Sequence, residues 1–190
     1  MRNNWGLAMI YKNDKITVRS IKEADLQLLA DWLSNPEVLQ YYEGRDRPHD
    51  LKMVRERFYL KDDETRCIVE YEGQAIGYIQ FYPLEKDSRR EYGYTDTDGS
   101  IYGTDQFIGE PRYWNRGIGK KLVRSMRDYL IHQRKADKVV MDPQAWNDRA
   151  LACYEQCGFI KKKLLKQHEL HEGQLRDCWL IEYTAESALS

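Results

Sequence analysis

The chain has 190 residues, with 30 Lys and Arg against 31 Asp and Glu and a formal net charge of −1. Its length suits one domain with a substantial core, and 42% hydrophobic residues, with 14 Tyr, 5 Trp and 4 Phe, exclude a disordered chain. The balanced charge argues against a general nucleic-acid binder, and no apolar run approaches the ~20 residues that a membrane helix needs. We therefore expect a soluble, single-domain protein over residues 1–190.

The first half of the chain alternates between strand and helix patterns. Residues 1–10 contain only a short apolar stretch before polar residues, so we expect no signal peptide. Ser20–Glu23 matches a capping box, S-x-x-E, which predicts a helix that ends near Pro36. Apolar spacing predicts the other elements: a strand at 15–19, a helix over 51–58, a hairpin of strands 67–71 and 75–82, and a polar connection over 85–99.

The second half continues the alternation. A strand pattern over 100–108 runs into Gly109–Pro111, where proline cannot donate a ladder hydrogen bond and glycine permits a turn. The later expected elements are a helix from 116 to 130, a buried strand at 139–141, a helix over 147–156, and strands at 159–165 and 177–183 joined by a loop around 167–176. This order predicts an α/β (α+β) fold in which helices cover a mixed sheet.

The cysteines and histidines show no metal-binding spacing. The four cysteines form no C-x-x-C pair, and two of them, Cys153 and Cys157, are four apart in a helical pattern. In the 168–171 segment, H-E-L-H, the histidines are three apart, whereas a zincin motif needs them four apart. We therefore expect no metal site, reduced cysteines and a cytoplasmic protein.

A glycine-containing segment, Arg116-Gly117-Ile118-Gly119, lies between a predicted strand and a predicted helix. At such a position, backbone N–H groups and the positive helix end form a nest for an anion such as a phosphate. A Walker loop is excluded because Lys121 replaces its Ser or Thr, and a dinucleotide fingerprint because Leu122 replaces its third glycine. The alternative is that the two glycines only form a turn.

Two segments in this region share motifs with one superfamily. Residues 114–119, W-N-R-G-I-G, resemble the Q/R-x-x-G-x-G/A loop of the Gcn5-related N-acetyltransferase (GNAT) superfamily, with Trp114 in place of the first Gln or Arg. Residues 147–159 resemble the N-x-x-A-x-x-x-Y-x-x-x-G-F helix of the same superfamily. The resemblance implies acetyl-CoA as cosubstrate and a mixed, mostly antiparallel sheet of about seven strands flanked by about four helices.

Three further segments, 102–111, 141–143 and 168–173, resemble the aminoglycoside 6'-N-acetyltransferases, including the acetyltransferase half of the bifunctional aminoglycoside-modifying enzymes. The resemblance spans roughly residues 15–184. It implies transfer of acetyl to the 6'-amine of an aminoglycoside of the kanamycin or tobramycin type, by direct attack in a ternary complex, and hence antibiotic resistance. We also expect a monomer or homodimer with no metal and no nucleic-acid or membrane partner.

Two residues are expected to handle protons, because the acceptor ammonium must lose a proton and the leaving thiolate must gain one. By the resemblance, Asp105 matches the proposed base of the family, and Tyr154 matches the superfamily tyrosine beside the CoA sulfur. The alternative is that Asp105 is held by amides in a bulged strand and that Tyr154 only packs under the sheet.

The resemblance and the residues themselves together predict two sets of binding residues. Those expected to bind acetyl-CoA are Phe107, Ile108, Arg116, Gly117, Ile118, Gly119, Lys120 and Asn147. Those expected to bind the acceptor are Tyr41, Tyr42, Gln80, Tyr82, Asp98, Asp105, Asp142 and Glu172. Aromatic faces suit sugar rings and ammonium groups, whereas Gln80 and Tyr82 are equally consistent with ordinary sheet surface.

Charge is unevenly distributed along the chain. Residues 91–110 contain five acids and no Lys or Arg, and residues 112–138 contain nine basic residues and two acids. An acidic region suits a polycationic drug, and a basic region suits the phosphates of CoA. Two alternatives stay open: acetylation of a protein N-terminus or another polyamine, and a non-catalytic acyl-CoA sensor, which would need neither Asp105 nor Tyr154.

Overall fold

The computed structural model describes residues 8–185, and the chain divides into two compact units. Unit 1 comprises Met1–Gln80 and Gln106–Arg116, and unit 2 comprises Phe81–Asp105 and Gly117–Ser190. The organisation as one domain over the whole chain stays a prediction. The expected absence of a signal peptide also stays a prediction, because it concerns residues 1–10, and residues 1–7 lie outside the described part of the chain.

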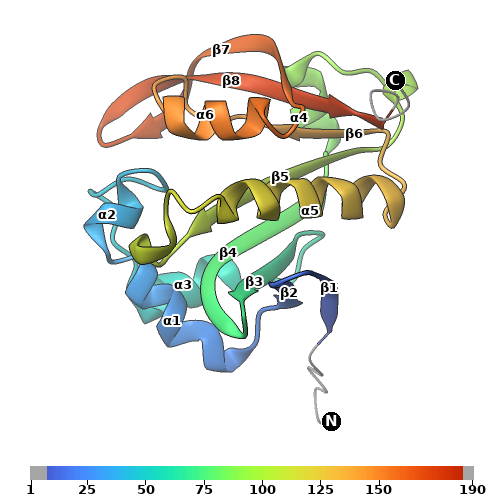
Figure 1. The fold of residues 1–190 in the computed structure, drawn as a ribbon. Helices are drawn as coiled ribbons and strands as arrows, with labels where there is room; N and C mark the ends of the chain where they lie inside the picture. The colour runs from blue at the N-terminus through green and yellow to red at the C-terminus, as the bar shows by residue number, and fades with distance from the viewer. Residues whose placement is uncertain (1–7, 186–190) are drawn as a thin grey trace. The chain divides into compact units, whose positions relative to one another are not determined.

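The described strands form a mixed sheet (Figure 1). They are β1 (Met9–Asn13), β2 (Ile16–Ser20), β3 (Thr65–Tyr71), β4 (Gln74–Pro83), β5 (Ile101–Ile108), β6 (Lys138–Met141), β7 (Ile160–His171) and β8 (Gln174–Thr184). Their order is β1-β2-β3-β4-β5-β6-β8-β7. β5 and β6 pair in parallel, whereas β1 with β2, β2 with β3, β6 with β8 and β7 with β8 pair antiparallel. The expected mixed sheet is confirmed, with eight described strands where about seven were expected.

Six α-helices accompany these strands where about four were expected. They are α1 (Leu26–Trp32), α2 (Pro36–Leu39), α3 (Leu51–Phe58), α4 (Lys86–Tyr92), α5 (Ile118–His132) and α6 (Asp148–Glu155). Three short 3-10 helices lie at Glu23–Asp25, Asp96–Asp98 and Pro111–Tyr113. None of the helices described within residues 8–185 is long and apolar enough to cross a bilayer.

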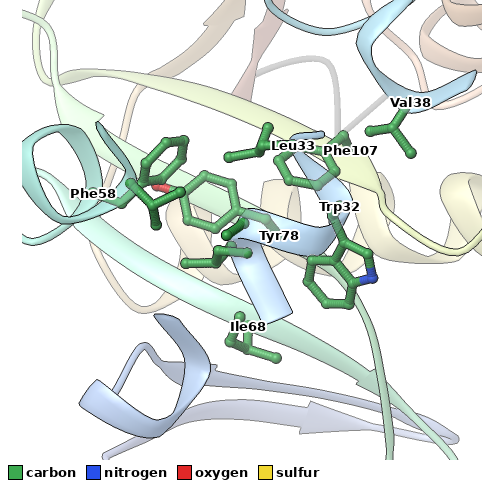
Figure 2. Packing of buried hydrophobic residues seen from close by; sticks show 10 residues of the cluster. Trp32, Leu33, Val38, Phe58, Ile68, Tyr78 and Phe107 are labelled. Carbon is green, nitrogen blue, oxygen red and sulfur yellow. The ribbon is translucent and has the colours of Figure 1, made fainter. Parts of the chain in front are cut away.

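The core of unit 1 combines aromatic rings with aliphatic side chains such as Leu33, Val38 and Ile68 (Figure 2). Phe58 on α3 meets Tyr78 on β4 edge to face, with ring centroids 5.1 Å apart, and Tyr78 stacks on Phe107 of β5 at 5.6 Å. Trp32 on α1 contacts Phe107 edge to face at 6.2 Å. Each such side chain stabilises the fold by roughly 1.5–3 kcal/mol on burial, so the cluster holds α1 and α3 against the strands of this unit.

The first helix of unit 1 does not begin at the predicted capping box. Ser20 ends β2, and the helical turn starts at Glu23, where the Asp25 carboxylate accepts a hydrogen bond of 2.9 Å from the Lys22 amide. Arg19 reaches the same carboxylate with two hydrogen bonds, 2.7 and 2.9 Å long. The buried ion pair therefore replaces the expected Ser–Glu box as the link between strand and helix.

Helix α4 lies in the segment predicted to be an irregular polar connection. None of its residues is buried, so it has no apolar periodicity that would reveal it. Its C-terminus is closed by Gly93 in the left-handed conformation, with φ 89°. Arg89 on this helix donates hydrogen bonds to the carbonyls of Thr95 and Gly99, at 2.6 and 3.0 Å. Local hydrogen bonds, the glycine cap and the packing of the half-buried Tyr92 against the core of unit 2 hold the helix in place.

The last two strands are longer than predicted. β7 and β8 continue through the segment predicted to be a loop and meet at a tight turn, where Glu172 and Gly173 both have positive φ. Their pairing shifts between Leu165, opposite Cys178, and Glu169, opposite Arg176. Between these pairs, three residues of β7, 166–168, lie opposite one residue of β8, Asp177, which is a β-bulge.

Candidate active site

Two carboxylates from the predicted acceptor set lie just past the paired stretch of the parallel strands β5 and β6, in unit 2. Gly103 on β5 pairs with Val140 on β6. Two residues further along, the register brings Asp105 on β5 beside Asp142, which directly follows β6. Residues two apart on a strand point to the same face of the sheet, so both carboxylates lie on the face to which Val140 points.

Tyr82 on β4 lies against the first of these carboxylates. Its hydroxyl donates a hydrogen bond of 3.1 Å to Oδ2 of Asp105. The ring crosses β5 at Gly103, where a Cβ would lie only 2.6 Å from Cζ of Tyr82. The absence of a side chain at this position is therefore what lets the Tyr82 hydroxyl reach Asp105.

The second carboxylate is surrounded by groups that were not among the predicted site residues. Tyr92 on α4 donates a hydrogen bond of 2.8 Å to Oδ2 of Asp142. Nε2 of His168 on β7 lies 2.9 Å from the same oxygen, and its Nδ1 lies 3.0 Å from Oε1 of Glu91. Tyr92, Glu91 and His168 were missing from the predicted site, because neither α4 nor the extension of β7, which orient these side chains, was predicted.

The β-bulge in β7 explains how His168 comes to face Asp142. Gln167 takes a left-handed conformation with φ 49°, and its amide donates a hydrogen bond of 2.8 Å to Oδ1 of Asp177 on β8. This turn of the backbone ends the regular alternation of β7 at the next residue, His168. Bulges next to functional sites commonly redirect one side chain in this way.

Burial and charge keep both tyrosines protonated. Burial, followed by the charges of Asp105 and Asp142, raises the pKa of Tyr82 far above its usual range. Burial and the same two carboxylates raise the pKa of Tyr92. Both hydroxyls are therefore donors at neutral pH, and their shared response to Asp105 and Asp142 shows that these four groups form one cluster.

The pKa values of Asp142 and His168 move in opposite directions. Burial favours the neutral acid at Asp142, but hydrogen bonds from His168 and Tyr92 outweigh it and hold the pKa of this carboxyl below its usual range. The hydrogen bond to Asp142 raises the pKa of His168 against the effect of burial, and the charges of Asp142, Glu91 and Glu169 add to the rise. The pair is therefore stabilised as carboxylate and imidazolium.

The other two acids of the predicted acceptor set have local roles in unit 2. Asp98 forms an ion pair of 2.6 Å with Lys138, and its other oxygen accepts hydrogen bonds from the amide and hydroxyl of Thr95. This engagement closes the 3-10 helix and lowers the pKa of Asp98. Glu172 lies in the β7–β8 turn. Asp98 therefore caps this 3-10 helix, and the contact of both acids with an acceptor stays a prediction.

Three predicted acceptor residues belong to unit 1. Tyr41 meets Trp114 edge to face at 5.8 Å, and Tyr42 packs on Phe107 at 4.6 Å. The side-chain oxygen of Gln80 accepts a hydrogen bond of 2.6 Å from the Tyr78 hydroxyl. These contacts place all three in or beside the aromatic core of their unit, and their role toward an acceptor stays a prediction.

The glycine segment opens α5 as predicted. Gly117 is the N-cap in the left-handed conformation, with φ 75°, and no side chain caps the first turn. A Cβ at Gly117 or at Gly119 would meet no atom of the described residues within 4 Å. First-turn amides of a 15-residue helix beside such open glycines fit an anion such as a pyrophosphate.

Basic side chains follow one side of α5 from this end. Nζ of Lys120 donates a hydrogen bond of 2.8 Å to the Gln156 side chain, and Arg124 donates one of 2.7 Å to the Gln156 carbonyl. Arg127 donates to the Cys157 carbonyl at 2.5 Å. The three cations therefore meet the carbonyl end of α6, where positive charge is favoured.

Two residues at α6, Asn147 and Tyr154, belong to the predicted cofactor and catalytic sets, and both make local contacts. Asn147 is the N-cap of α6, and its side chain accepts a hydrogen bond of 3.2 Å from the Ala150 amide. Tyr154 is half-buried and lies 6.4 Å from the ring of Phe159, edge to face. The roles of Asn147 and Tyr154 toward acetyl-CoA stay predictions.

The end of β5 in unit 1 is irregular, as predicted from its Gly and Pro. The amides of Gly109 and Glu110 donate to the same carbonyl, that of Ile76, at 2.8 and 3.3 Å. The Trp114 indole donates a hydrogen bond of 2.8 Å to the Ile108 carbonyl, which assigns a structural role to the residue that departs from the family loop. The guanidinium of Arg116 lies 5.4 Å from the Tyr113 ring centroid. The Phe107 side chain belongs to the core, so only its backbone fits the expected cofactor role.

Metal-binding groupings are not found within residues 8–185, where no three His, Cys, Asp or Glu side chains gather closely enough to hold an ion. The two histidines of the 168–171 segment have different surroundings: His168 faces Asp142, whereas His171 is buried and meets the Trp146 ring at 5.8 Å. The four cysteines are free thiols.

Comparison with known proteins decides the family. Residues 22–167 match the family model described as an acetyltransferase (GNAT) domain. The aminoglycoside N(6')-acetyltransferase type 1 of Klebsiella pneumoniae is 30% identical over 154 residues, which cover 79% of this chain and 76% of that protein. The chain belongs to the GNAT acetyltransferase family.

Other GNAT proteins are also similar to the chain. The structure of AAC(6')-Ib in complex with ribostamycin and coenzyme A is matched with a TM-score of 0.74 at 25% identity, over 93% of this chain and 97% of that one. The spermidine N(1)-acetyltransferase of Vibrio cholerae is 22% identical over 170 residues, covering 87% of this chain and 90% of that protein. The protein is therefore a GNAT acetyltransferase, and its relatives differ in the amine they acetylate.

Proposed function

We propose that this GNAT enzyme transfers acetyl from acetyl-CoA to the 6'-amine of an aminoglycoside, by direct attack in a ternary complex, and so confers resistance in the cytoplasm. The observation that carries the proposal is the cluster of Asp105 and Asp142 with the phenols of Tyr82 and Tyr92. Adjacent carboxylates attract an acceptor with several ammonium groups, and neutral phenol rings suit both ammonium and sugar. The similarity to aminoglycoside N(6')-acetyltransferase type 1 supports the same assignment.

Asp105 is the residue we assign to proton removal. The 6'-amine arrives as an ammonium and must be neutral before it can attack, so a carboxylate has to bind it and receive or relay its proton. The hydrogen bond from Tyr82 fixes the orientation of Asp105, while Asp142 holds a second ammonium of the acceptor. Positioning the amine in this way converts a bimolecular step into an effectively unimolecular one.

The proposed acetyl-CoA site lies at the start of α5. The residues Gly117, Ile118, Gly119 and Lys120 fit the pyrophosphate, and the cosubstrate supplies an activated thioester when bound. Tyr154 carries the hydroxyl that we assign to protonation of the leaving thiolate. The amides of Phe107 and Ile108 are proposed to hold the pantetheine arm by backbone hydrogen bonds, as an added strand would.

A simpler polyamine is the second candidate acceptor. The similarity to spermidine N(1)-acetyltransferase favours it, because a linear polyamine also carries several ammonium groups. The two candidates differ in shape: an aminoglycoside offers rings for the aromatic side chains, whereas spermidine offers only methylene chains.

The direct test is an acetylation assay. The protein is incubated with acetyl-CoA and either kanamycin, an aminoglycoside with a 6'-hydroxyl, or spermidine; thiol release is followed, and the acetyl position is located by mass spectrometry. We expect fast acetylation of the 6'-amine of kanamycin and a kcat/KM at least 100-fold lower for spermidine, because ring contacts and a second ammonium site are lost. Absence of thiol release with every 6'-amino aminoglycoside would refute the proposal, and preference for spermidine would select the second candidate.

A further inference from the structure

His168 occupies a position between two carboxylates in unit 2. Its Nε2 lies 2.9 Å from Asp142, and its Nδ1 lies 3.0 Å from Glu91. The His168 side chain is only 18% exposed, compared with 30% for Asp142 and 56% for Glu91. Each ring nitrogen therefore faces an acceptor oxygen, and the ring is more shielded from water than either carboxylate.

This geometry is satisfied only by the charged ring. A doubly protonated imidazolium donates one hydrogen bond to Asp142 and one to Glu91. In a neutral ring one nitrogen carries a lone pair, which then faces a carboxylate oxygen without a proton between them. Loss of the proton therefore removes one favourable contact and leaves the cluster more negative by one charge.

We propose that His168 is the resident counter-cation of the acceptor subsite, and that its proton is released to solvent when an ammonium group of the acceptor binds Asp142. The substrate ammonium then replaces the imidazolium charge beside this carboxylate. This inference rests on the proposed function for the identity of the acceptor. It makes His168 a positioning residue, which acts on the substrate through Asp142.

Charged and titratable groups that face His168 from α4, from the end of β6 and from β7 agree with this role. Asp142 faces it from the end of β6, Glu91 and Tyr92 face it from α4, and Glu169 follows it on β7. The amine of Lys163, also on β7, donates to the backbone carbonyl of Glu91 at 3.0 Å. The carboxylates raise the pKa of His168, so the proton is held until a competing cation arrives.

The consequence is a proton-linked affinity for the acceptor. At pH values below the pKa of His168, an acceptor ammonium competes with the imidazolium for Asp142. At pH values above that pKa, His168 is neutral and the acceptor ammonium has no such competitor. The informative quantity is the KM of the wild type for tobramycin divided by the KM of a variant that cannot be protonated. At pH values below the pKa of His168, this ratio falls by up to about tenfold for each unit by which the pH rises. The ratio cancels titration of the acceptor's own amines, because both proteins receive the same drug.

The experiment compares the wild type with His168→Gln between pH 5.5 and 8.5, with His132→Gln as control, since His132 is exposed at the end of α5. We expect the His168→Gln protein to have the lower KM for tobramycin at pH 5.5, with the two proteins converging at high pH. The KM for acetyl-CoA stays equal in all three proteins. A KM ratio that does not change with pH, or a higher KM for His168→Gln at pH 5.5, overturns the inference.

A second measurement is independent of turnover. The pKa of His168 is followed by NMR in the free enzyme, with saturating tobramycin, and in Glu91→Gln. We expect tobramycin to lower it, and Glu91→Gln to lower it without the drug because one facing charge is gone. Turnover of tobramycin with an unmoved His168 pKa overturns this inference alone, whereas a lowered pKa without turnover refutes the proposed function alone.

Discussion

Substitution of Gly103 by Ala tests whether close approach of the Tyr82 ring builds the Asp105 site. An alanine Cβ would lie 2.6 Å from Cζ and 2.9 Å from the hydroxyl oxygen of Tyr82, both too short for unbonded atoms. Either the ring or strand β5 must move. Overpacking of this kind costs about 1–3 kcal/mol of unfolding free energy. At a slope near 2 kcal/mol per M, that is a shift of the urea midpoint by about 0.5–1.5 M.

The steric origin of this loss is separated by a double-mutant cycle with Tyr82→Ala. Once the ring is absent, Gly103→Ala meets open space, and alanine stabilises a strand by roughly 0.5–1 kcal/mol relative to glycine. The coupling between the two substitutions should therefore be at least about 1.5 kcal/mol. It is measured by urea unfolding of the four proteins. Additive effects would show that the ring and the glycine do not depend on each other, and would refute the argument.

The same substitution also reports on catalysis. Moving the ring takes the Tyr82 hydroxyl away from Asp105, and a hydrogen bond to a charged group is worth about 1.5–3 kcal/mol, which is tenfold or more in kcat/KM for the acceptor. Tyr82→Phe removes the hydroxyl without the clash and should lose activity to a similar extent while keeping most of its stability. Full activity in Tyr82→Phe would show that Asp105 does not depend on this donor.

Three further substitutions test other contacts. Asp105→Asn should lower turnover by at least about 100-fold while the KM for acetyl-CoA is kept, as measured by thiol release; unchanged turnover would remove it as the base. Trp114→Phe should cost about 1 kcal/mol in urea unfolding, because the backbone carbonyl that the indole binds loses its donor; a wild-type midpoint would contradict this. Arg19→Met should lower the free energy of unfolding by about 3–5 kcal/mol, because it leaves the buried Asp25 carboxylate without its cation. The control Lys15→Met breaks an exposed ion pair and should leave the urea midpoint nearly unchanged. Equal effects of the two substitutions would refute the role of burial.

Elements with an apolar face were predictable from the sequence, and elements held by polar contacts were not. Helix α3 was placed at its observed residues because Val54 and Phe58 recur at helical spacing and are both buried. Helix α4 has no fully buried residue, and besides the half-buried Tyr92 it is held by the hydrogen bonds of Arg89 and by the Gly93 cap. Such contacts depend on where distant carbonyls lie, so the composition of the segment indicated only a polar loop.

The same limit explains the missing half of the candidate site. Asp105 was predicted from its place before the glycine segment, but Tyr92 and His168 were not. Tyr92 lies on the polar helix, and His168 follows a bulge that depends on the Asp177 side chain. The extra residues of a bulge interrupt the alternating pattern by which a strand is predicted. The sequence of β7 therefore resembled a shorter strand followed by a loop.

The uneven charge along the chain has a more specific meaning in the structure. Acids from residues 91–110 do not form one surface, because Asp98 pairs with Lys138 while Asp105 lies with Asp142, far along the chain. What brings Asp105 and Asp142 together is the β5–α5–β6 crossover, which sets two parallel strands with their carboxyl ends at one edge of the sheet. That edge is where open α/β sheets bind their ligands, and the crossover helix begins with the glycine segment and Lys120. The proposed acceptor subsite and the proposed anion-binding end of α5 therefore arise from one topological feature. A count of charges along the sequence finds the acidic and the basic segment without showing why they belong together.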